Sequence, residues 1–243
     1  SRYGAVAVLR NVTEEEQFRR LQENFVANVS HELRGPLASV SATLEAFADG
    51  VIPEQNRSRY LNAMLTEMER LRRLSYDVVD LTRLDSGLVT LNQKPFSLDQ
   101  VFRNVETKTV QRCAGAGLTL QVDMSGLTVF ADYDRVEQIL INLLDNAIRF
   151  TPNGGVIRLF ARGEGDMVRT SVADTGIGIP PEHVPHIWER FYKVDQARTL
   201  MPGSGTGLGL AIVRQLVEQM DGEVTVKSEP GAGTTMSFTL PKG

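Results

Sequence analysis

The chain has 243 residues, of which 42% are hydrophobic and 23% are charged, a composition typical of globular proteins. The length favours two compact units, the net charge of −4 argues against a nucleic-acid partner, and the single cysteine, Cys113, excludes an intrachain disulfide. No apolar run approaches the roughly 20 residues that a membrane-spanning helix needs.

An apolar segment over residues 4–9 predicts a β-strand near the start of the chain. Thr13-Glu-Glu-Glu16 follows it and has the pattern of a capping box, which bonds the first free N–H groups of a helix. The strand and its exit resemble the closing part of a PAS sensor domain. We therefore predict that residues 1–13 are the end of a PAS domain and a linker, with any membrane anchor upstream.

Two amphipathic helices are predicted next, separated by Asp49-Gly50 and Pro53. Apolar residues recur every three or four positions in both, which is the helical period. The first stripe contains Phe18, Leu21, Phe25, Val29, Leu33, Leu37, Val40, Leu44 and Phe47, and the second contains Leu61, Met64, Met68, Leu71, Ser75, Val78 and Leu81. Because a lone hairpin cannot bury both stripes, we expect residues 14–92 to pair with a second copy in a four-helix bundle.

The helical period stops near Leu91-Asn-Gln-Lys-Pro95, and residues 93–243 are predicted to form a separate α/β domain. Strands are expected at 118–122, 128–131, 156–161, 167–173, 223–227 and 234–240, and helices at 98–115, 133–149 and 207–220. Interleaved strands and helices of this kind predict a two-layer sandwich, an open sheet covered by helices on one face.

The predicted helix at 133–149 has an unusual polar side. At about 100° per residue, Gln138, Asn142, Asn146 and Arg149 fall on one face. The opposite face, expected in the core, carries Val136, Ile139, Leu140, Leu143, Ala147 and Phe150. Two asparagines one turn apart could ligate Mg²⁺ through their carbonyl oxygens beside a phosphate chain. A polar surface that happens to contain asparagine fits this face equally well.

Two glycine-rich stretches lie farther along the chain. Asp174-Thr-Gly-Ile-Gly178 follows a predicted strand, and Gly203-Ser-Gly-Thr-Gly-Leu-Gly209 precedes a predicted helix. Glycines let the backbone approach a ligand closely, and a helix N-terminus favours phosphate. The second stretch has neither the glycine spacing of a Rossmann fingerprint nor the Gly-Lys-Ser/Thr of a P-loop, so neither of those sites is predicted.

Together these segments resemble the Bergerat ATP-binding fold, which histidine kinases share with type II topoisomerases, heat-shock-90 chaperones and mismatch-repair ATPases. Residues 142–149 resemble its N box, 174–178 its G1 box, 188–192 its F box and 203–209 its G2 box. The resemblance implies that Asp174 accepts the adenine amino group, that Asn142 and Asn146 hold Mg²⁺ and phosphates, and that residues 193–205 form a lid over ATP. The other implied ATP-binding residues are Gly176, Gly178, Gly203, Gly205, Thr206, Gly207, Leu208 and Gly209.

Position 142 separates the branches of this fold. In the ATP-hydrolysing members a glutamate one turn before the second asparagine activates water, and here that position holds Asn142. An amide cannot act as a general base. We therefore expect a site that donates phosphate elsewhere, which disfavours the chaperone and topoisomerase branches.

His31 is the predicted phosphate acceptor. With His31 at 0°, seven apolar side chains of its helix lie about 160–240° away, so His31 should point out of the bundle. They are Val26, Val29, Leu33, Leu37, Val40, Leu44 and Phe47. The segment 25–37, Phe-Val-Ala-Asn-Val-Ser-His-Glu-Leu-Arg-Gly-Pro-Leu, resembles the H box of histidine-kinase hairpins. Imidazole is nucleophilic near neutral pH, and Glu32 is the predicted base for its Nδ1 proton, with a plain solvated charge as the alternative. Lys193 and Arg149 are expected to stabilise charge in the transfer.

These features predict a cytoplasmic sensor histidine kinase that acts as a homodimer. It is expected to use Mg²⁺ and ATP to phosphorylate His31 and then to pass the phosphate to an aspartate of a response regulator. The alternatives are a non-catalytic scaffold that binds ATP and a hydrolysing ATPase of the same fold. Gly35 stands where the family commonly has Thr or Asn, which predicts weak phosphatase activity toward the regulator, and His183 and His186 are interpreted as loop surface.

Overall fold

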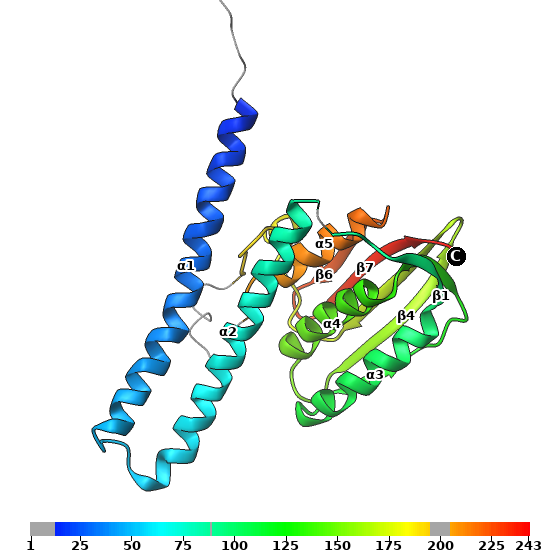
Figure 1. Ribbon diagram of the computed structural model, residues 1–243. Helices are drawn as coiled ribbons and strands as arrows, with labels where there is room; N and C mark the ends of the chain where they lie inside the picture. The colour runs from blue at the N-terminus through cyan, green and yellow to red at the C-terminus, as the bar shows by residue number, and fades with distance from the viewer. Residues whose placement is uncertain (1–12, 88, 195–204) are drawn as a thin grey trace, which may run out of the picture. The chain divides into compact units, whose positions relative to one another are not determined.

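The computed structural model describes residues 13–87, 89–194 and 205–243, with side chains described from residue 23 onward (Figure 1). The chain divides into two compact units, Ser1–Leu71 and Arg72–Gly243. The strand predicted at 4–9 and its PAS assignment lie outside the described residues, as do residues 195–204 of the predicted lid. No helix in the described part of the chain is long and apolar enough to cross a membrane.

The predicted helical hairpin is confirmed. Helix α1 (Thr13–Ala48) runs without a break through Pro36, and α2 (Arg57–Asp85) follows the short 3₁₀ helix η1 (Glu54–Asn56). Many apolar side chains of the hairpin remain exposed in the single chain. Their exposed fractions are 53% for Leu37, 52% for Leu44, 49% for Leu61, 66% for Leu65 and 51% for Met68.

The second unit contains the predicted two-layer α/β sandwich. Its sheet has the order β2-β4-β5-β7-β6, in which only β2 and β4 run parallel. The strands are β2 (Thr119–Val122), β4 (Val156–Glu164), β5 (Met167–Asp174), β6 (Val224–Glu229) and β7 (Gly233–Pro241). Helices α3 (Leu98–Gly115), α4 (Tyr133–Phe150) and α5 (Gly209–Gln219) cover one face (Figure 1). This layering follows from alternation, since strand residues such as Ile157, Leu159 and Phe238 are buried.

A second, two-stranded sheet lies beside this sandwich. β1 (Gln93–Ser97) pairs antiparallel with β3 (Thr128–Asp132), so that Phe96 lies opposite Val129. β1 was not predicted, because Lys94 and Pro95 interrupt the alternation that marks a strand. The strand begins within the stretch where the helical period ends.

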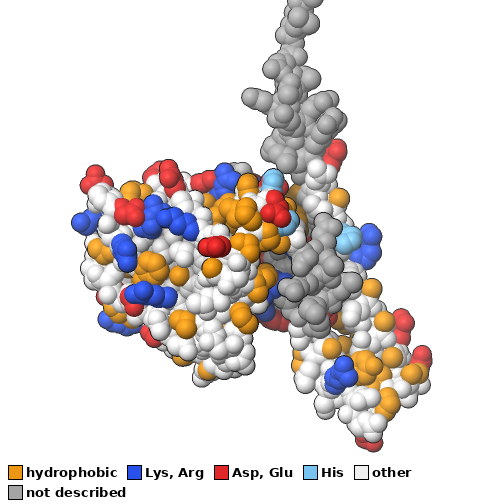
Figure 2. All heavy atoms as spheres, turned by 180° about the vertical axis from the view of Figure 1, so that it is seen from behind, with side chains coloured by type: hydrophobic (Ala, Val, Ile, Leu, Met, Phe, Trp, Pro, Cys, Tyr) orange, Lys and Arg blue, Asp and Glu red, His pale blue; other side chains and the backbone are white. Residues whose placement is uncertain are grey.

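Among the described residues, no helix covers the far face of the five-stranded sheet. Figure 2 shows this side, where Lys, Arg, Asp and Glu side chains lie among hydrophobic and uncharged ones. Arg158 is exposed between the buried residues Ile157 and Leu159 of β4, and Arg162 is exposed farther along the strand. Arg169 Nε donates to Glu164 Oε1 at 2.7 Å. The polar face of α4 lies instead in the helical layer, and Asp174 lies at the end of β5.

Candidate active site

The predicted polar face of α4 is present and is well positioned. Asp132 caps the helix, its Oδ1 accepting from the backbone N–H groups of Asp134 at 3.1 Å and Arg135 at 3.2 Å. Asn142 and Asn146 are partly exposed, while the opposite face is buried. Two aligned amides thus lie one turn apart on a helix that the core holds in place.

The prediction that Phe150 belongs to the buried face of α4 is wrong. Phe150 is 44% exposed, whereas Leu144 is fully buried. Phe150 is the last residue of α4, and its ring lies under the Arg149 guanidinium, whose Cζ is 5.0 Å from the ring centroid. A cation–π contact at the helix end replaces core packing there.

The second glycine stretch lies against this polar face. A Cβ added to Gly205 would be 2.4 Å from Arg149 Nη1, and one added to Gly209 would be 3.6 Å from Asn142 Oδ1. Gly207 has a positive φ of 75° and no room for a side chain, because a Cβ would lie 2.8 Å from Phe191 Cα. The fold therefore brings the predicted N box, F box and G2 box together.

Asp174 ends β5 and is fixed by the backbone around it. Its Oδ1 accepts from the N–H groups of Gly176 at 2.8 Å and Thr234 at 3.3 Å. Burial raises the pKa of this carboxyl, although these two hydrogen bonds act in the opposite direction. Gly178 has a φ of 69° and lies so close to Glu229 that a Cβ would be 2.0 Å from the Glu229 carbonyl oxygen. The loop after β5 therefore packs closely against the turn between β6 and β7.

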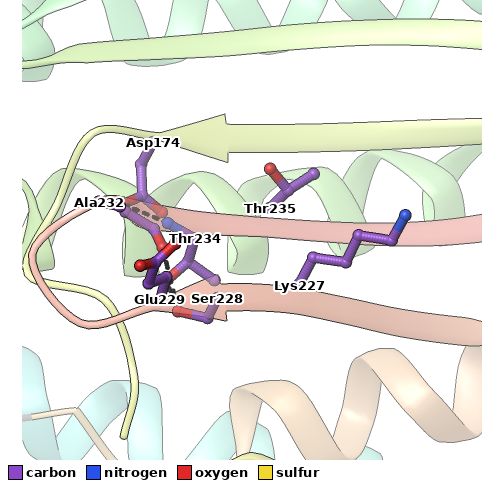
Figure 3. A pocket seen from close by; sticks show the side chains of 8 residues that line it. Asp174, Lys227, Ser228, Glu229, Ala232, Thr234 and Thr235 are labelled. Carbon is purple, nitrogen blue, oxygen red and sulfur yellow. Dashed lines mark hydrogen bonds between the residues drawn. The ribbon is translucent and has the colours of Figure 1, made fainter. Parts of the chain in front are cut away.

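A pocket opens at this end of the sheet, and Asp174 is part of its lining (Figure 3). In Figure 3 Asp174 and Thr234 lie together, and a dashed line joins them. Ser228 Oγ supports the cluster by donating to Gly233 O at 3.1 Å and by accepting from Ile179 N at 2.8 Å. Thr234 and Ser228 were not predicted as site residues, because no spacing in the sequence relates them to Asp174.

His31 lies on α1 and is exposed, as its helical position predicted. Glu32, by contrast, has a side chain only 13% exposed, so the solvated-charge alternative is wrong. Its Oε2 accepts from Arg70 Nη2 on α2 at 2.9 Å. Arg70 was not predicted, because the two residues are 38 positions apart.

The last turns of α2 belong to the second unit and contact its nucleotide-related segments. Thr206 Oγ1 donates to Asp77 Oδ2 at 2.7 Å, and Gln138 Nε2 donates to Asp80 Oδ2 at 2.7 Å. Burial is the main cause of the raised pKa of Asp77, and it outweighs the hydrogen bond from Thr206. Two aspartates of α2 therefore bond one residue of the predicted G2 box and one of the polar face of α4.

The remaining predicted residues are placed as follows. Leu208 is buried and Lys193 is partly exposed, while Gly203 lies outside the described residues. His183 and His186 bond neighbours in the same loop, Tyr192 Oη at 2.7 Å and Glu189 Oε1 at 2.6 Å. These bonds account for both histidines structurally.

Comparison with known proteins agrees with this geometry. Residues 21–87 match the family described as "His Kinase A (phospho-acceptor) domain", and residues 131–243 match "Histidine kinase-, DNA gyrase B-, and HSP90-like ATPase". The sensor histidine kinase YclK of Bacillus subtilis is 38% identical over 227 residues, which cover 93% of this chain and 48% of YclK. The chain belongs to the histidine kinase family. It spans about half the length of this curated relative.

Solved histidine kinases share the fold. The structure of histidine kinase ThkA in complex with the response regulator protein TrrA superimposes with a TM-score of 0.73 at 26% identity, covering 95% of this chain and 66% of that one. Full-length ShkA in complex with AMPPNP gives a TM-score of 0.66 at 29% identity, covering 94% and 46%. In this histidine kinase, His31 lies within the span matched by the phospho-acceptor family, and the polar face of α4 lies within the span matched by the ATPase family.

Proposed function

We propose that this chain is the catalytic part of a sensor histidine kinase that uses ATP to phosphorylate its own His31. One observation carries the proposal. The ATPase-like domain has an amide, Asn142, at the position of the water-activating base, and the same chain presents an exposed histidine on a hairpin of the phospho-acceptor family. A donor site without a water-activating base is suited to an acceptor outside itself.

In the proposed reaction His31 is the nucleophile. Its Nε2 forms the bond to the γ-phosphorus as the bond between that phosphorus and ADP breaks, and Glu32 accepts the proton from Nδ1. Arg149 and Lys193 would offset the negative charge that develops on the transferred group. Asp174, held through Oδ1, would direct its other oxygen to the adenine amino group.

The donor set fits Mg²⁺ bound together with phosphates. Among the described residues, no cluster of three or more His, Cys, Asp or Glu side chains could hold a metal ion by itself. Asn142 and Asn146 would instead supply amide oxygens beside the phosphate chain, with Gly205–Gly209 approaching from the other side. When bound, Mg²⁺ would neutralise charge on the phosphates.

Partners and location follow from the same proposal. The exposed apolar side chains of the hairpin support a homodimer with a four-helix bundle. The ThkA–TrrA complex supports a response regulator as the partner, and an aspartate of that regulator is the final phosphate acceptor in this proposal. We place the reaction in the cytoplasm, where ATP is available, with or without an anchor elsewhere in the full protein.

The deciding test is incubation with γ-labelled ATP and Mg²⁺, comparing the unmodified chain with His31→Gln. We expect label on the unmodified chain only, stable in alkali and lost in acid, as a phosphoramidate is. Label that survives acid, or that persists in His31→Gln, would contradict the proposal. Steady release of phosphate without any phosphoprotein would instead indicate a hydrolysing ATPase, and nucleotide binding without either would indicate a scaffold.

A further inference from the structure

An ion pair across the hairpin fixes the orientation of Glu32. Arg70 Nη2 on α2 donates to Glu32 Oε2 on α1 at 2.9 Å, and the two side chains are only 15% and 13% exposed. A charge-assisted hydrogen bond that is shielded from water is strong and directional. Arg70 therefore constrains, from the other helix, the carboxylate of the residue that follows His31 in the sequence.

Arg70 makes this bond although a second carboxylate is closer to it in sequence. Glu67 lies three residues before Arg70 on α2, and its Oε2 is 3.7 Å from Arg70 Nη1. That oxygen is buried and accepts no hydrogen bond in the described part of the chain. Pairs three residues apart on a helix are the ordinary local arrangement, and unsatisfied buried oxygens are rare. In this fold Arg70 therefore donates its hydrogen bond to Glu32 on the other helix, and Glu67 Oε2 is left without one.

We propose that Arg70 is a positioning residue for phosphorylation of His31, acting through Glu32. The inference rests on the proposed function, in which Glu32 accepts the Nδ1 proton. Without Arg70, the Glu32 carboxylate would lose the charge-assisted hydrogen bond that constrains it from α2. With Oε2 held, the carboxylate keeps one orientation for accepting the proton. Arg70 itself touches no reacting atom.

The kinetic test uses the whole chain with Arg70→Met, Arg70→Lys, Glu32→Gln and the double variant Glu32→Gln/Arg70→Met. We expect Arg70→Met to lower the rate constant of His31 labelling at least about tenfold without changing the KM for ATP, because general acid–base catalysis contributes about 10²–10⁴ and orientation is part of it. Arg70→Lys should recover part of the loss. In the Glu32→Gln background, Arg70→Met should change the rate less than about twofold, because residues that act as a unit are not additive.

A control and a second readout separate this role from folding and from the proposed function. Arg57→Met breaks the exposed Arg57–Glu54 pair of the same hairpin and should leave the rate unchanged. The tautomer of the His31 ring, measured by ¹⁵N NMR, does not require kinase activity. We expect Arg70→Met to lower the fraction with the proton on Nδ1 as Glu32→Gln does, and Arg70→Lys to keep it.

An unchanged tautomer in Arg70→Met, or an Arg70→Met effect that simply adds to that of Glu32→Gln, would overturn the role of Arg70. The absence of label on the unmodified chain would contradict the proposed function instead, while the tautomer measurement would still decide about Arg70.

Discussion

The two carboxylate oxygens of Asp174 have different roles: Oδ1 bonds the protein backbone, and Oδ2 is the one proposed to meet the ligand. Oδ1 accepts from Gly176 and Thr234, so the orientation of the side chain is fixed before a nucleotide arrives. Preorganisation of this kind costs nothing at the moment of binding. It also determines what a substitution at this position would do.

We expect Asp174→Asn to weaken ATP binding and to shift the base preference. The asparagine oxygen would keep the two backbone bonds, which leaves its NH₂ group where Oδ2 meets the base. A donor would then face the adenine amino group, and losing a charge-assisted bond worth about 1.5–3 kcal/mol predicts at least about tenfold weaker binding. Binding of ITP, which carries a carbonyl at that position, should fall less.

Isothermal titration with ATP and ITP checks this prediction, with Asp123→Asn as the control. Asp123 accepts from Arg158 Nε at 2.8 Å and is not part of the proposed site, so its neutralisation should leave both affinities unchanged. Equal losses for ATP and ITP in Asp174→Asn would show that Asp174 does not meet the base.

Gly35 is a second residue with a specific consequence. It lies one turn after His31 in an unbroken helix, and a Cβ added there would meet no atom within 4 Å. A threonine therefore fits, and its hydroxyl would lie on the face of His31, where by the family's mechanism it orients water for dephosphorylation of the regulator. We expect Gly35→Thr to speed loss of phosphate from a purified phospho-regulator severalfold while leaving His31 labelling intact.

Gly35→Ala is the matched control for this prediction. Alanine removes the whole helix penalty of glycine, about 1 kcal/mol, and threonine removes only part of it, but only threonine supplies a hydroxyl. If alanine accelerates dephosphorylation as much as threonine does, helix stability and not the hydroxyl controls the reaction.

At the scale of elements, the C-terminal half of α2 packs within the second unit and hydrogen-bonds its glycine-rich segment. Leu74, Leu81 and Leu84 are buried, and Asp77 accepts from Thr206 in the glycine-rich segment. The burial that raises the pKa of Asp77 favours its protonated form in the folded state. Between its unfolded and folded pKa values the folded state binds more protons, so the contribution of this group to stability is lost as pH rises through the folded pKa.

We therefore expect Asp77→Asn to stabilise the protein at neutral pH. Asparagine keeps an acceptor for Thr206 and removes the buried charge. A gain of about 1 kcal/mol in the free energy of unfolding corresponds to a rise of about 2–4 °C in Tm for a unit of this size. The difference in Tm from the unmodified chain should shrink as pH falls toward the ordinary pKa of an aspartate, about 3.9. Asp85→Asn, which removes the ion pair with Arg190 at 2.6 Å, should lower Tm instead. A lower Tm for Asp77→Asn at neutral pH would contradict the argument.

Periodicity predicted most of the elements, and its failures have identifiable causes. The amide face of α4 was predicted because helix geometry alone aligns Asn142 with Asn146. The apolar stripe predicted for α2 was only partly right. Leu74 and Leu84, which were not in it, are buried, while Ser75, which was, is exposed. The reason is that the last turns of α2 also pack within the second unit. β1 was missed because its pairing with β3, and not its own sequence, makes it a strand.

The site was predicted less completely than the fold. Motif resemblance identified Asp174 and the glycines, which are local in sequence. Arg70 and Thr234 act on residues 38 and 60 positions away, and such partners are chosen by tertiary packing that one sequence does not reveal.

At the scale of the whole molecule, the proposed donor and acceptor lie in separate compact units of one chain. His31 belongs to the unit that ends at Leu71, and the polar face of α4 to the unit that begins at Arg72. The transfer therefore requires the two units to meet. This separation is why Arg70 is expected to change the rate of transfer but not the affinity for ATP.

The apolar side chains that the single hairpin leaves exposed have a thermodynamic consequence. If their cover is a second copy of the chain, folding of the hairpin and association are one equilibrium, governed by mass action. The free energy of the bundle then contains a term in the logarithm of chain concentration. A cell that makes more of this protein would raise the fraction of chains with a complete bundle as well as their number, so signalling capacity would grow more steeply than abundance.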